Sequence, residues 1–107
     1  MAPAVPMGIE KITFDLSRLA ANGLVGPPHG LRSLSYEFCI PATAEALAEV
    51  QAIDPTVHFY PHSAGRIGCT SEQYLCIGNT RQPNWQQVLL GIAQLEYVER
   101  IDEFFGE

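Results

Sequence analysis

The sequence predicts a single α+β domain, and three observations lead to this fold class. Apolar residues alternate with polar ones in several short segments, which is the pattern of half-buried strands. Two longer segments repeat their apolar residues with the period of a helix. The chain has 107 residues, of which 47% are hydrophobic, and this suits one core. We expect residues 1–8 to be a flexible terminus and residues 9–107 to form the domain.

The first predicted element is a strand at residues 12–17, where apolar and polar side chains alternate. Asn22-Gly23 then forms a turn, because both residue types adopt positive φ at low cost. Alternation resumes at residues 34–40, with Ser35, Glu37 and Cys39 on the face opposite to the apolar residues. The two strands are expected to form an N-terminal hairpin.

The first predicted helix follows directly. Thr43 can cap its free backbone N–H groups, and Glu45 places negative charge at its positive end. The helix should end at Asp54, since Pro55 disfavours the helical conformation in the residue before it.

Two short strands come next, at residues 57–60 and 74–78, with a glycine-containing loop at residues 62–68 between them. A second helix should begin near Pro83, because the residues that follow have the clearest helical period in the chain. For residues 97–104 the sequence allows a continued helix or a new strand. We favour the strand, since one helix from Pro83 onward would be long for a compact domain.

The resulting order from residue 34 is β-α-β-β-α-β, which is typical of a ferredoxin-like two-layer sandwich. The N-terminal strand or hairpin is an addition to that order. Two helices cover one face of such a sheet and leave the other face open. We expect dimerisation or the N-terminal hairpin to cover the open face, so the partner is a second copy or another protein.

The charge balance excludes some classes of partner. The net charge is −6, and such a chain has few groups to neutralise phosphates. We therefore expect no nucleic-acid and no membrane partner. The acidic C-terminal part is interpreted as a solvated face, with a docking surface for a basic partner as the alternative. The basic residues are Lys11, Arg18, Arg32, Arg66, Arg81 and Arg100.

The three cysteines are Cys39, Cys69 and Cys76. An odd number of cysteines, in a chain whose start has no features of a secretion signal, points to free thiols in a reducing compartment. The expected location is the cytoplasm.

Several motifs resemble those of a family of small uncharacterised cyanobacterial proteins. The resemblance covers roughly residues 33–105 and implies a bacterial cytosolic protein, with no functional residue to carry over. The motifs are Ser35-Tyr-Glu-Phe-Cys-Ile-Pro41, Gly65-Arg-Ile-Gly-Cys-Thr70, Gln73-Tyr-Leu-Cys-Ile-Gly-Asn-Thr80, Pro83-Asn-Trp85 and Tyr97-Val-Glu-Arg-Ile-Asp102.

The strongest candidate for a binding site is the loop that contains Ser63, Gly65, Arg66 and Gly68. Successive backbone N–H groups beside a guanidinium are the ingredients of an anion-binding nest. An ordinary turn is the alternative interpretation, because the loop matches no nucleotide-binding motif.

Two other chemistries use the same region. Cys69 could act as a nucleophile with His58 or His62 as the base, although no orienting carboxylate is evident. His58, His62, Cys69 and Cys76 together have the ligand types of a zinc site, but their spacing is unusual. Cys76 is more simply interpreted as a core residue of its strand.

The sequence therefore predicts a non-catalytic cytosolic interaction or regulatory module that binds a protein partner or a small anionic ligand. No cofactor is expected. A small cysteine-dependent enzyme and a zinc-stabilised structural protein are the alternatives.

Overall fold

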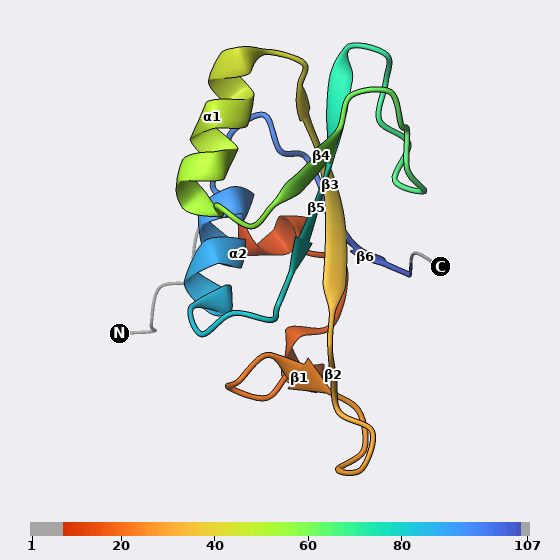
Figure 1. The fold of residues 1–107 in the computed structure, drawn as a ribbon, viewed down its shortest axis with the longest axis vertical. Helices are drawn as coiled ribbons and strands as arrows, with labels where there is room; N and C mark the ends of the chain where they lie inside the picture. Colours follow the sequence, from red (N-terminus) through yellow and green to blue (C-terminus); the bar gives the residue numbers. More distant parts are fainter. Residues whose placement is uncertain (1–7, 106–107) are drawn as a thin grey trace.

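A computed structural model describes residues 8–105 and shows an α+β fold with two α-helices and two antiparallel sheets (Figure 1). The expected flexible terminus lies outside these residues, apart from Gly8. The main sheet has four strands in the order β4-β5-β3-β6. They are β3 (Ser35–Pro41), β4 (His58–Tyr60), β5 (Gln73–Asn79) and β6 (Ile101–Phe104).

Strand β3 lies inside the main sheet and pairs with β5 along its whole length. Tyr36, Phe38 and Ile40 are fully buried on the face that carries the helices. The close approach of Tyr36 explains a glycine in β5, because a Cβ at Gly78 would lie 2.5 Å from the tyrosine ring. The strand predicted at residues 34–40 is confirmed.

Helix α1 (Ala44–Ile53) has the predicted cap and the predicted end. The Thr43 Oγ1 accepts a hydrogen bond of 3.0 Å from the Ala46 backbone N–H. Ala46 and Val50 are its buried residues, and they face the sheet-side core.

Helix α2 (Trp85–Ala93) is also confirmed. Trp85 is 2% exposed, and its indole Nε1 donates to the Ala21 carbonyl at 2.9 Å. The helix buries one apolar stripe, which consists of Trp85, Val88, Leu89, Ile92 and Ala93.

The choice of strand over helix near the C-terminus is confirmed, although the strand begins later than predicted. The Val98 N–H donates to the Leu95 carbonyl at 3.1 Å, so the chain turns there before β6 begins at Ile101. Ile101 pairs with Phe38 and is fully buried.

The strand predicted at residues 12–17 is wrong. A short 3₁₀ turn, η1 (Ile9–Lys11), precedes this segment, and a second one, η2 (Leu16–Arg18), takes up its end. The Asp15 carboxylate accepts from the Ser17 N–H at 2.9 Å, which favours a turn over an extended chain. The overall strand arrangement also differs from the expected one. The N-terminal part adds a separate small sheet of β1 (Leu24–Val25) and β2 (Arg32–Ser33).

The face of the main sheet opposite to the helices is called the outer face below. Among the N-terminal segments, η1 packs against α2 on the helix side, and the Thr13 Oγ1 reaches the edge of the outer face, where it donates to Asp102 at 2.8 Å. The loop at residues 61–72, between β4 and β5, lies on this side of the sheet (Figure 1). Within residues 8–105 no helix is both long and apolar enough to cross a membrane.

Candidate functional site

The outer face carries nearly all of the polar chemistry of the main sheet. Residues directly opposite each other in an antiparallel ladder point to the same face, so the register defines its members. They are Ser35, Glu37, Cys39, Pro41, His58, Tyr60, Gln73, Leu75, Ile77, Asn79, Asp102 and Phe104.

A disulfide joins Cys39 of β3 to Cys69 of the β4–β5 loop, with Cα atoms 5.5 Å apart. The bond tethers the loop to the outer face. The prediction of free thiols is therefore wrong for these two residues, and Cys76 alone remains free. The sequence could not show the pairing, because the two residues are 30 positions apart and meet only when the loop folds back.

Glu37 lies beneath the tethered loop and is 1% exposed. Its Oε1 accepts a hydrogen bond of 3.3 Å from the Ile67 backbone N–H. The loop passes so close that a Cβ at Gly65 would lie 2.6 Å from this oxygen. Gly65 also has a φ of 65°, which other residues rarely adopt, so both space and conformation require glycine.

The predicted anion nest already holds internal acceptors. The Gly65 N–H donates to the Ser63 Oγ at 3.3 Å, and the Gly68 N–H donates to the Ala64 carbonyl at 3.1 Å. The Ile67 N–H donates to Glu37, so the loop already binds a carboxylate of the protein itself. Arg66 is exposed and forms no ion pair among the described residues.

The alternative catalytic set does not form in this structure. Cys69 is bonded to Cys39 and has no thiol to act as a nucleophile. His58 is on the exposed edge strand β4, and His62 is exposed on the loop.

The zinc ligand set is not brought together either. Cys76 is opposite Phe59 on the helix-facing side, whereas His58 is on the outer face. Burial raises the pKa of the Cys76 thiol to about 12, which opposes formation of the thiolate that a metal needs. No group of three or more His, Cys, Asp or Glu side chains within residues 8–105 has the geometry of a metal site.

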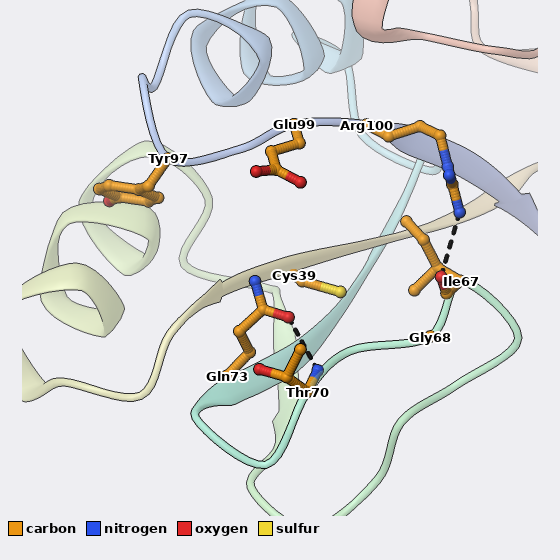
Figure 2. Close-up of a pocket in the computed structure, with 8 residues that line it drawn as sticks. All are labelled: Cys39, Ile67, Gly68, Thr70, Gln73, Tyr97, Glu99 and Arg100. Carbon is orange, nitrogen blue, oxygen red and sulfur yellow. Dashed lines mark hydrogen bonds between the residues drawn. The ribbon is translucent and has the colours of Figure 1, made fainter.

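A cavity of about 480 Å³ opens beside the disulfide, and we call it the disulfide cavity (Figure 2). Arg100 closes one side, since its Nε donates to Asp102 at 3.0 Å and its Nη2 donates to the Ile67 carbonyl at 3.0 Å. Glu99 is an exposed carboxylate in its wall. The lining residues are Cys39, Ile67, Gly68, Thr70, Gln73, Tyr97, Glu99 and Arg100.

A second cavity, of about 340 Å³, is at the end of the outer face that the loop leaves uncovered. We call it the Arg81 cavity. The Asn79 Nδ2 donates to the Ser35 Oγ at 2.9 Å, and the Asn79 Oδ1 accepts from the Arg81 backbone N–H at 2.6 Å. The lining residues are Ser35, Thr56, His58, Ile77, Gly78, Asn79 and Arg81.

The Arg81 cavity contains two basic side chains and no carboxylate. Arg81 forms no ion pair with any described residue. In the sequence, Arg81 is only one of several scattered basic residues. The signal that could have found it was weak, since Arg81 follows a predicted strand by three positions and His58 is the second residue of another.

In comparisons with family models, with curated proteins and with solved structures, this chain gave no match. The resemblance to small cyanobacterial proteins stays a prediction from the quoted motifs.

Proposed function

We propose that the protein is a non-catalytic binding module that holds a small anion, a phosphate or a carboxylate, in the Arg81 cavity. One observation carries the proposal. In a chain of net charge −6, this cavity brings together Arg81 and His58 with no acidic side chain in its wall.

The donors that line the Arg81 cavity suit an oxyanion. The guanidinium of Arg81 offers N–H groups in a planar fork that matches carboxylate and phosphate oxygens. Ser35 already accepts a hydrogen bond from Asn79, so its own hydroxyl hydrogen is free to turn toward a ligand. A His58 imidazole can add a further N–H. The backbone of Gly78 forms part of the cavity lining.

The non-catalytic part of the proposal rests on the same lining. A nucleophile with an adjacent base is the usual requirement of covalent catalysis. The lining contains the hydroxyls of Ser35 and Thr56 and the imidazole of His58, but among the described residues no hydrogen bond joins His58 to either hydroxyl. Binding alone therefore accounts for the residues present.

We also propose that residues 35–104 have the ferredoxin-like arrangement. The order β3-α1-β4-β5-α2-β6 and the antiparallel neighbours β4-β5-β3-β6 support it. For the location we propose the bacterial cytoplasm, on the sequence resemblance. A disulfide in that compartment is expected to be a transient or redox-sensing one.

The test is titration of the oxidised protein with inorganic phosphate at low ionic strength, followed by amide shifts in two-dimensional NMR. We expect shifts at Asn79 and Arg81, and we expect Arg81→Gln to weaken binding about tenfold or more, since a charged hydrogen-bond donor contributes about 1.5–3 kcal/mol.

Arg66→Gln is the matched control, because it removes the same charge from the predicted loop site. The proposal predicts unchanged affinity for this variant. Equal weakening by both substitutions would mean unspecific attraction, and weakening by Arg66→Gln alone would place the anion on the loop; either outcome contradicts the proposal.

A homodimer through the uncovered part of the outer face is a second proposal. Phe104 and Ile77 are only partly buried there, and the loop at residues 61–72 covers the opposite end. Apolar side chains on an open sheet face favour a packing partner.

A further inference from the structure

We propose that the Cys39 Sγ is a site of thiol–disulfide exchange with a dithiol reductant, and that reduction releases the β4–β5 loop from the outer face. This goes beyond anion binding and does not depend on it. The proposal combines three features: the route to the sulfur, the chemistry of exchange and the contacts that hold the loop.

The route to the sulfur is the disulfide cavity. Cys39 lines this cavity and its sulfur lies among the labelled side chains of Figure 2, whereas Cys69 is absent from the lining and is 7% exposed. A cavity of about 480 Å³ has room for a cysteine side chain and its neighbours. An incoming thiolate therefore reaches Cys39 more readily than Cys69.

The exchange proceeds in two balanced steps. The thiolate of the reductant attacks the Cys39 Sγ, the bond to Cys69 breaks, and Cys69 leaves as a thiolate that takes a proton from water. The second thiol of the reductant loses its proton and attacks the first sulfur of the reductant, which is bonded to Cys39. This step releases the Cys39 thiolate. The protein disulfide is reduced and the dithiol is oxidised to its disulfide.

Cys76 cannot supply the resolving thiol, and attack of the released Cys69 thiolate on Cys39 only restores the original disulfide. Cys76 is fully buried on the helix-facing side of β5, and Cys39 points to the outer face. The sheet separates the two sulfurs. Complete reduction therefore needs a second thiol from the reductant. A monothiol must supply it from a second molecule, whereas a dithiol supplies it within the mixed disulfide and should complete the reaction faster.

Apart from the disulfide, the loop contacts the outer face through Gly65, which lies against Leu75, and through Ile67. The Ile67 N–H donates to Glu37 at 3.3 Å, and the Ile67 carbonyl accepts from Arg100 at 3.0 Å. Glu37 is a carboxylate that gains hydration when the loop leaves. Without the disulfide, the conformational entropy lost when a long loop is ordered opposes the stabilisation from these two hydrogen bonds. We expect the loop to open while the ladder of β3 and β5 persists.

The first experiment uses reduced glutathione, a monothiol, on the oxidised full-length protein. Rapid alkylation and peptide mass mapping then identify the modified residue. We expect the adduct on Cys39, with a rate that does not change across low urea concentrations. An adduct on Cys69, or a rate that rises with urea as global unfolding does, would overturn the proposal.

A pair of variants tests the route through the cavity. Glu99 is in the cavity wall, and its charge repels the anionic glutathione. Glu99→Gln should speed adduct formation about twofold at low ionic strength. Glu96→Gln makes the same charge change on an exposed residue outside the cavity lining and should have a smaller effect. Equal effects would contradict entry through the cavity.

The second experiment measures loop release by amide hydrogen exchange of the dithiothreitol-reduced, alkylated protein. We expect the Ile67 N–H to lose protection and the Val50 N–H in α1 to keep it. Retained protection at Ile67, or loss at both positions, would refute local release. Cys39→Ser should reproduce the reduced pattern, and Cys76→Ser, which leaves the disulfide in place, should reproduce the oxidised one.

Discussion

At the scale of single residues, the face of a strand decides what a cysteine can do. Cys39 points outward and meets Cys69, so both form a disulfide. Cys76 belongs to the neighbouring strand but points toward the helices, where it is fully buried. The alternation of residues 34–40 could be read from the sequence, and it correctly separates Cys39 from the core. The partner of Cys39 could not be read in this way.

Burial of Cys76 should make the protein less stable at alkaline pH. The pKa of this thiol rises from 9.0 to about 12, because burial disfavours the thiolate. Above pH 9 the unfolded chain releases this proton while the folded protein keeps it. The stabilisation is therefore complete below pH 9 and declines as pH rises toward 12, by at most about 1.4 kcal/mol per pH unit.

Urea unfolding between pH 8 and pH 10 measures this effect, and Cys76→Ala is the control. We expect the free energy of unfolding of the variant to fall less steeply with pH than that of the parent. Burial also raises the pKa values of Tyr36 and Tyr97, but tyrosines ionise mainly above this window. Identical slopes for the variant and the parent would contradict the assignment.

At the scale of elements, the packing of α2 depends on a contact with residues far from the helix in the sequence. The Trp85 indole donates to Ala21, and a Cβ at Gly23 would lie 2.9 Å from the indole ring. Thr80 adds a hydrogen bond of 2.7 Å to the Gly23 carbonyl. The start of the helix thereby holds the turn before β1.

Trp85→Ala should lower the free energy of unfolding by about 3–5 kcal/mol, because it leaves a cavity and an unpaired carbonyl at Ala21. Chemical denaturation measures this loss. Tyr60→Ala is the control, since Tyr60 is 44% exposed and its removal should change stability by about 0.5 kcal/mol or less. A similar midpoint for both variants would refute the role of Trp85.

The helices were predictable because their signals are local. Thr43 caps α1 through a residue three positions away, and the apolar stripe of α2 repeats every turn. The strand prediction for residues 12–17 failed because the alternation of apolar residues competes there with a local turn signal. Asp15 bonds to Ser17 in a turn, and Ile12 keeps only an isolated parallel bridge to Ile101.

At the scale of the whole molecule, the two sheet faces differ in how they are covered. The helices bury the centre of one face, although Phe59 at its edge is 37% exposed, whereas the loop at residues 61–72 covers only part of the outer face (Figure 1). The expected N-terminal hairpin does not form, because residues 12–17 are not a strand. The alternative, a second copy, stays a prediction.

Sedimentation equilibrium over a range of protein concentrations tests the homodimer. We expect a dimer for the parent chain and a weaker one for Phe104→Glu, which places a charge on the uncovered part of the outer face. Leu31→Glu is the control, because Leu31 is 48% exposed and outside the main sheet. A stable dimer buries about 1,200–2,000 Å² in total, so a monomer at all concentrations would refute the proposal.

The sequence by itself determined the fold class and the positions of both helices and of the strands of the main sheet. These features follow from periodicity, caps and prolines, which act over a few residues. Only the tertiary structure decided the Cys39–Cys69 disulfide, the burial of Glu37 under Gly65 and the meeting of His58 with Arg81 in one cavity. Each of these joins residues from distant segments, and such contacts depend on strand register and on the path of a loop rather than on local pattern.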